Sequence, residues 1–177
     1  MIKLHPFYES DFNQLIAAVP DADFLLQWAG PYYSYPLDSS QLKDTLLKTI
    51  GVKPAFKVFK AIHTDTQKPV GHIQLKDIDY YNASCVLGNV LIFQEHRRKG
   101  FGKAMVGLAV RDAFENLSIK EIKLNVFDFN VYAIAIYQKI GFVEHQVIKD
   151  VRKFQNDSWN LIRMKLNKDQ WLHNREC

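Results

Sequence analysis

The residues with the clearest chemical potential form a short basic turn, RRKGFG, at positions 97–102. Three cations directly precede two glycines that are separated by one residue, and the following residues have helical spacing. A strand that leads through a glycine turn into a helix presents unpaired backbone N–H groups at the positive end of the helix dipole, where phosphate binds. We therefore favour a phosphate site here over the alternative of a solvated run of charge.

Two well-known phosphate motifs can be tested by spacing. A Walker A loop requires Gly at position 97 and Ser or Thr at position 104, where this chain has Arg97 and Ala104. A dinucleotide-binding fingerprint requires a third small residue where Met105 stands, although Asp128 could bind a ribose after the next strand. The first motif is excluded and the second matches poorly.

Hydrophobic periodicity predicts the elements that position this turn. Residues 85–93 are almost continuously apolar, as in a central strand covered on both faces, and Gly88 within them indicates a bulge or a close backbone approach. After the turn, apolar residues from Val106 to Leu117 recur with helical spacing. Residues 119–126 form the next strand, and Asn130 then caps a helix that Gly141 terminates. These segments make an α/β unit.

The flanking segments complete the expected architecture. Residues 23–36 place five aromatic side chains between glycine and proline, which makes this segment a candidate binding wall or a hydrophobic lid over the core. The other periodic segments are a helix over 10–19 capped by Ser10, a helix over 38–50, a hairpin of strands over 55–62 and 70–78, and two final strands over 143–149 and 158–166.

Composition narrows the class of protein. The 177 residues are 47% hydrophobic and 24% charged, which predicts one ordinary globular domain over residues 1–177. The net charge of +4 comes from well-mixed charges, no apolar run approaches the length of a membrane span, and two cysteines make no disulfide framework or metal cluster. We expect a cytoplasmic monomer or homodimer with no metal and with neither nucleic acid nor membrane as a partner.

Two motifs together resemble a known family. The pattern Arg97-x-x-Gly100-x-Gly102 at a strand-to-helix junction resembles the acyl-CoA pyrophosphate loop of the GNAT (Gcn-five-related) N-acetyltransferases. The downstream series resembles the second motif of that family, through Leu124, Val126, Asn130, Ala133, Tyr137, Gly141 and Phe142. The resemblance covers about residues 86 to 142. The tail over 157–166 is similar to the last strand of members that acetylate the amino termini of ribosomal proteins.

The resemblance implies a fold and a co-substrate. The fold is α/β (α+β), with a central, mixed, mostly antiparallel and splayed sheet of six to seven strands flanked by about four helices. The co-substrate is acetyl-CoA, whose pyrophosphate, ribose phosphate and pantetheine would meet the turn, the basic side chains and the strand before them. The implied cofactor-binding residues are Leu91, Ile92, Arg97, Arg98, Lys99, Gly100, Phe101, Gly102, Lys103 and Asn130.

The resemblance also implies a catalytic residue. An amine that attacks the thioester expels a thiolate, and Tyr137, two helical turns after Asn130, is placed to protonate it. The alternatives are an ordinary core tyrosine at 137 and a plain helix cap at 130. Many members carry a strand glutamate as base, but Gly88 stands at that position. The base is therefore open among water, His72, Asp77, Asp79 and Asp128.

The acceptor side is expected at the aromatic segment. Trp28, Tyr32 and Tyr33 would hold an apolar or cationic amine against their rings. The interpretation that follows is an N-acetyltransferase acting on a primary amine, which could be a protein N-terminus, a polyamine or another small amine. The alternative is a non-catalytic acyl-CoA binding or sensing domain, because the strand glutamate is missing. A nucleic-acid binder would rest on the basic cluster alone.

Overall fold

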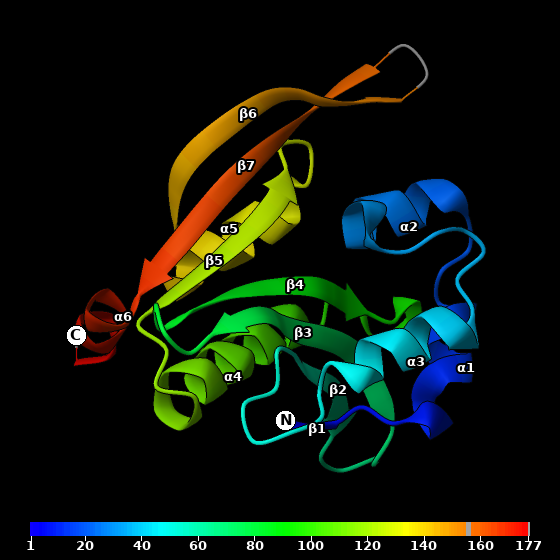
Figure 1. The fold of residues 1–177 in the computed structure, drawn as a ribbon, viewed down its shortest axis with the longest axis horizontal. Helices are drawn as coiled ribbons and strands as arrows, with labels where there is room; N and C mark the ends of the chain where they lie inside the picture. The colour runs from blue at the N-terminus through cyan, green and yellow to red at the C-terminus, as the bar shows by residue number, and fades with distance from the viewer. Residues whose placement is uncertain (155–156, 177) are drawn as a thin grey trace.

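A single sheet organises the chain in this computed structural model, which describes residues 1–154 and 157–176. Seven strands lie in the order β1-β2-β3-β4-β5-β7-β6 in the described residues (Figure 1). All neighbours pair antiparallel except β4 and β5, which are parallel. This confirms the mixed, mostly antiparallel sheet. The strands are β1 (Ile2–Pro6), β2 (Lys57–His63), β3 (Pro69–Asp79), β4 (Ser84–Ile92), β5 (Glu121–Phe127), β6 (Val143–Phe154) and β7 (Asp157–Asn167).

Helices cover both faces of the first four strands. The α-helices are α1 (Phe12–Ala17), α2 (Ala22–Ala29), α3 (Ser39–Leu47), α4 (Phe101–Asn116), α5 (Val131–Ile140) and α6 (Lys168–Glu176). One hydrophobic core lies between the sheet and α4, and a second lies between the sheet and helices α1 to α3. None of the helices in the described residues is long and apolar enough to cross a membrane.

The centre of the sheet is splayed. Strands β4 and β5 pair only over Ser84–Val86 and Glu121–Lys123, although both strands continue well beyond these residues. Figure 1 shows them meeting at their N-terminal ends and then diverging toward α2 and the β6–β7 hairpin. The expected splay is confirmed, and the edge of β4 that faces β5 has no strand partner beyond Val86 in the described residues.

A β-bulge divides β4 into two parts. The pairing with β3 runs from Gln74 opposite Gly88 to His72 opposite Leu91, so β4 contains one extra residue there. That stretch includes Asn89, whose φ is +50°. Cys85 and Leu87, before the bulge, face the α4 core, whereas Leu91 and Phe93, after it, face the core under α1 to α3, so the odd-numbered positions change face at the bulge. The bulge expected near Gly88 is thus confirmed.

Several other expectations need correction. The first helix begins at Phe12, after a 3₁₀ turn at Glu9–Asp11 (η1), instead of at Ser10. The aromatic segment contains α2, whose N-terminus is capped by Asp21 through the Phe24 N–H at 2.7 Å. Strand β1 and helix α6 were not expected. In α6 only Trp171 is buried among the residues whose side chains are described, so the sequence carries almost no amphipathic signal.

Candidate active site

Gly100 shapes the turn between β4 and α4. It is the N-cap of α4 with φ +78°, in the left-handed region that favours glycine. Nothing lies within 4 Å of a Cβ added there, so conformation and not space requires the glycine. Arg98 also has a left-handed φ of +62°. A 3₁₀ turn at Gln94–His96 (η3) carries the chain from β4 into this region.

The turn leaves a row of backbone donors free. Among the described residues, no protein acceptor receives the N–H groups from Arg98 to Lys103, and the first bond of the helix runs from the Ala104 N–H to the Gly100 carbonyl at 3.3 Å. These donors lie at the positive end of the α4 dipole. The arrangement suits an anion with several oxygens, such as a pyrophosphate.

Basic side chains hold and surround the turn. The Arg97 Nε donates to the Ile92 carbonyl at 3.1 Å, and the Lys99 Nζ donates to the Glu95 carbonyl at 2.9 Å. Both side chains therefore help to fix the loop. A groove of about 820 Å³ extends from the turn along α4 toward the end of α5 and α6. The cations in its lining are Lys103, Arg111 and Lys139.

Helix α5 faces the same region from the other strand of the splay. Asn130 is its N-cap, with the side-chain oxygen accepting the Ala133 N–H at 3.3 Å. Gly141 ends the helix with φ +111°. Tyr137 is 7% exposed, packs edge-on against Phe142 at 5.9 Å between ring centroids, and belongs to the core beneath α4. Burial raises the pKa of Tyr137 above its ordinary value.

The aromatic segment is partly core and partly surface. Trp28 stacks on Tyr33 at 6.1 Å between centroids, and Tyr33 is 6% exposed with its hydroxyl 2.8 Å from the Thr45 Oγ1. Tyr32 stands edge-on to Tyr33 and remains 36% exposed. Of the three expected acceptor residues, Tyr33 is thus mainly structural, and Tyr32 offers its ring at the surface.

A polar row on β3 lies under these rings. His72, Gln74 and Lys76 alternate along the strand and share one face. His72 is 1% exposed, its Nε2 lies 2.9 Å from the Gln74 Nε2, and burial lowers its pKa to about 3. It is therefore a neutral, enclosed histidine. Such a group is poorly placed to take a proton from an incoming amine.

Two lysines meet at the Tyr32 ring. The Lys48 Nζ donates to the Tyr32 hydroxyl at 2.6 Å, and the Lys76 Nζ donates to the Asn89 Oδ1 at 2.7 Å. A Cβ added at Gly88 would lie 3.0 Å from the Lys76 Cε and 3.1 Å from its Nζ. The lysine thus fills the space above this position. No spacing pattern in the sequence links these residues, and their grouping was missed.

The other carboxylates that were considered as the base differ in their hydrogen bonds. Asp79 accepts the N–H groups of Tyr81 and Asn82, each at 2.9 Å, and so closes the turn before β4. Asp77 is exposed. Asp128 follows β5 and accepts from the Asn160 Nδ2 at 2.8 Å. The described residues contain no group of three or more His, Cys, Asp or Glu that could hold a metal ion.

Comparisons with known proteins agree with this geometry. Spermidine N(1)-acetyltransferase of Vibrio cholerae is 33% identical over 81 residues, 45% of this chain and 46% of that enzyme. The chain thus spans about half the length of that relative. Acetyltransferase PseH of Campylobacter jejuni is 26% identical over 158 residues, 85% of this chain and 90% of that protein.

A solved structure supports the same fold. The spermidine N-acetyltransferase of Vibrio cholerae in complex with CoA and spermine matches with a TM-score of 0.84 at 20% identity, covering 97% of this chain and 98% of that one. The sequence model of the Acetyltransferase (GNAT) family matches residues 22–142, which is more than half of the chain. The protein therefore belongs to the GNAT acetyltransferase family.

Proposed function

We propose that the protein is an acetyl-CoA-dependent N-acetyltransferase that acts on the primary amine of a small molecule. The observation that carries this proposal is the row of free backbone N–H groups from Arg98 to Lys103, next to the splayed edge of β4. Family membership supports it, as does the similarity to two acetyltransferases of Vibrio cholerae and Campylobacter jejuni.

In this proposal the turn and β4 bind the donor. The N–H groups of Arg98, Lys99, Gly100, Phe101, Gly102 and Lys103 would hold the pyrophosphate. The side chain of Arg97, Arg98 or Lys99 would screen the ribose phosphate through a charge-assisted hydrogen bond. The free edge of β4 near Leu91 and Ile92 would pair with the amides of pantetheine as a strand would, and Asn130 would line the other side.

The reaction needs two proton movements. A neutral amine attacks the thioester carbon, the carbon–sulfur bond breaks, the nitrogen loses a proton to water, and the departing thiolate gains a proton. Tyr137 is proposed to supply that last proton. Burial raises its pKa, so the phenol stays protonated at neutral pH and remains available as a donor.

The acceptor is proposed to enter beside Trp28, Tyr32 and Tyr33. The relatives named for spermidine and spermine make polyamines obvious test acceptors, together with amino acids, short peptides and aminosugars. We further propose that residues 1–177 work as one transferase domain in the cytoplasm.

Thiol release tests the proposal directly. Purified protein with acetyl-CoA and a panel of primary amines should release CoA in proportion to acetylated product, measured with a thiol reagent and by mass spectrometry. CoA binding in the absence of turnover with every amine would instead support an acyl-CoA binding domain, the reading motivated by Gly88 in place of a strand glutamate.

A further inference from the structure

Two ammonium groups converge on one ring without a carboxylate partner. The Lys48 Nζ lies 4.8 Å and the Lys76 Nζ 5.3 Å from the centroid of the Tyr32 ring. Neither lysine takes part in an ion pair within the described residues. Two cations held this close repel each other unless an anion joins them.

Two acidic residues of the covering elements cap their own helices. Asp21 caps α2 through the Phe24 N–H, and Asp38 caps α3 through the Gln41 N–H. Asp77 follows Lys76 in sequence, is exposed, and makes no ion pair with it. Burial lowers the pKa of Lys76 and the charge of Asp77 raises it, so Asp77 compensates this lysine in part, although no carboxylate in the described residues forms an ion pair with either lysine.

Buried hydrogen-bond donors accompany the lysines. Asn89 is 4% exposed; its Oδ1 accepts from Lys76, which leaves its Nδ2 without a partner. The Trp28 Nε1, the His72 Nδ1 and the Gln74 Oε1 also lack partners; the indole N–H is a donor, the amide oxygen is an acceptor, and the role of the imidazole nitrogen depends on its tautomer. Buried donors without acceptors are rare and destabilising, so their concentration on one face points to a ligand rich in acceptor oxygens.

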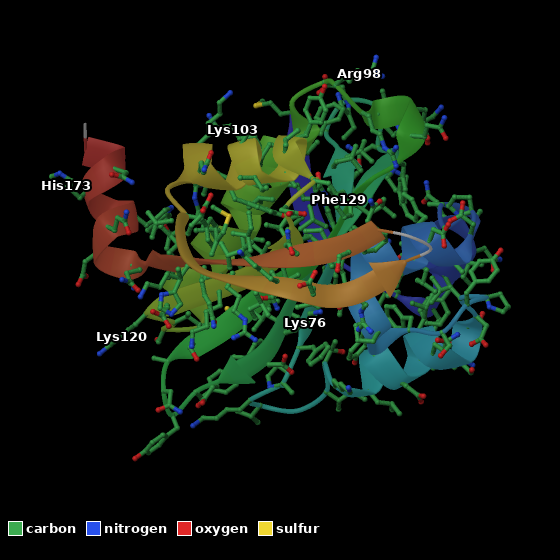
Figure 2. All side chains as sticks on the ribbon, turned by 90° about the horizontal axis from the view of Figure 1, so that it is seen from above. Lys76, Arg98, Lys103, Lys120, Phe129 and His173 are labelled. Atoms are coloured by element: carbon green, nitrogen blue, oxygen red, sulfur yellow. The ribbon has the colours of Figure 1, made fainter. Side chains whose placement is uncertain are left out.

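This site is separate from the phosphate turn. Figure 2 shows Lys76 on one side of the β6–β7 hairpin and Arg98 and Lys103 on the other. Lys76 lies above Gly88 and contacts Asn89, at the bulge where β4 has already left β5. Its cations are therefore placed to meet the acceptor and not the phosphates of CoA.

Resting on the proposed function, we infer that the amine acceptor also carries an oxyanion, a carboxylate or a phosphate, and that Lys48, Lys76 and the Asn89 amide bind it. A polyamine offers only N–H donors and positive charge at neutral pH, so this wall would repel it. The same lysines disfavour the protonated form of a nearby amine. They therefore help the acceptor to react without a strand glutamate.

Matched pairs of acceptors test the inference. The pairs are glycine with glycinamide, phosphoethanolamine with ethanolamine, and glucosamine 6-phosphate with glucosamine, and spermidine is added as a polyamine. We expect kcat/KM to be higher for the oxyanion member of at least one pair, and higher than for spermidine. The pair that shows the preference tells whether a carboxylate or a phosphate is bound.

Variants identify the lysines as the cause. Lys76→Met should raise KM for the preferred acceptor about 10- to 100-fold, the range expected for one hydrogen bond to a charged group. The dissociation constant of CoA should not change. Lys48→Met should act in the same direction. Lys43→Met is the matched control. Lys43 is an exposed residue of α3, the helix whose C-cap is Lys48, and it pairs with Glu9 at 3.5 Å.

Three results decide the matter. If spermidine is the best acceptor and Lys76→Met leaves its KM unchanged or lowers it, the inference is wrong while the transferase function stands. If no amine reacts although CoA binds, the transferase proposal fails. Calorimetry with the same pairs then decides the inference alone: tighter binding of oxyanion members, lost in Lys76→Met, supports it, and equal binding within pairs overturns it.

Discussion

Gly100 adopts the left-handed conformation in the turn between β4 and α4. The φ of Gly100 is +78°, and nothing lies within 4 Å of a Cβ added there. The substitution Gly100→Ala therefore causes no steric clash, and its only cost is that of the left-handed conformation. We expect the free energy of unfolding to fall by about 1–2 kcal/mol and CoA to bind more weakly. Urea denaturation and calorimetry measure the two effects.

Gly107 provides the control within the same helix. It lies inside α4, and nothing is within 4 Å of an added Cβ. Gly107→Ala should therefore raise the free energy of unfolding by about 0.5–1 kcal/mol through helix propensity. Equal effects of the two substitutions would show that Gly100 tolerates a side chain and that the turn does not rely on its conformation.

Substitution of Tyr137 should affect the rate of the reaction and not the binding of CoA. Tyr137→Phe keeps the ring against Phe142 and removes the proposed proton donor, so kcat should fall about 10²-fold or more while the affinity for CoA stays the same. Because burial raises the pKa of Tyr137, loss of its proton should not limit the rate until the pH exceeds about 10, the ordinary tyrosine pKa.

Tyr132→Phe is the matched control for this experiment. Tyr132 lies on the same helix and is 85% exposed, so its substitution should leave kcat and its pH profile unaltered. A Tyr137→Phe enzyme as fast as the parent would remove the phenol from the mechanism and leave it as a core side chain.

Prediction from sequence succeeded at the residue scale where the signal is local. The turn around Gly100 and the caps Asn130 and Gly141 depend on backbone conformations that few residue types adopt, so their identities are informative. Lys48 and Lys76 each contact the ring of Tyr32, and the three residues come from different parts of the chain. Only the tertiary fold brings these residues together, so no sequence motif predicts their grouping.

At the scale of elements, the splay of β4 from β5 exposes backbone that the proposed pantetheine contact would cover. Adding CoA should slow amide exchange within residues 87–92, measured by mass spectrometry, because strand-like pairing protects N–H groups. Residues 84–86 already pair with β5 and should change little.

A fragment of the cofactor sharpens this experiment. Adenosine 3′,5′-bisphosphate lacks the pantetheine arm, so it should fail to protect residues 87–92. Slower exchange in these residues with the fragment as well would show a general stabilisation and would argue against pairing of pantetheine with β4.

Elements with strong periodicity were predictable, and those fixed by tertiary contacts were not. The buried positions of helix α4 recur from Met105 to Phe114, over about three turns, so this helix can be predicted from the sequence. Strand β1 is short and lies at the sheet edge, and α2 is hidden in a segment whose aromatic residues, glycine and proline resemble a turn. Their structure depends on packing against residues far along the chain.

At the scale of the whole molecule, His72 should couple stability to pH. Burial lowers its pKa to about 3, and the unfolded value is about 6.5. Between these values the unfolded chain binds a proton that the folded chain excludes, so the free energy of unfolding decreases as the pH falls. We expect a loss of about 2 kcal/mol between pH 7 and pH 5 from this group, measured by urea denaturation.

Substitution isolates this contribution. His72→Phe should make the loss of stability over this interval smaller by the same amount, whatever its effect at pH 7. His5→Gln, which changes an exposed histidine on β1, should keep the slope of the parent. An unchanged slope in His72→Phe would mean that the folded protein accepts a proton at His72.

The bulge in β4 also constrains how the chain can vary in length. Residues Cys85 and Leu87 before the bulge serve one core, and Leu91 and Phe93 after it serve the other. Substitutions there alter one side chain at a time, but an insertion or deletion of a single residue would reverse the orientation of everything on one side of it. The apolar positions that flank the bulge should therefore tolerate changes of residue type far better than changes of spacing.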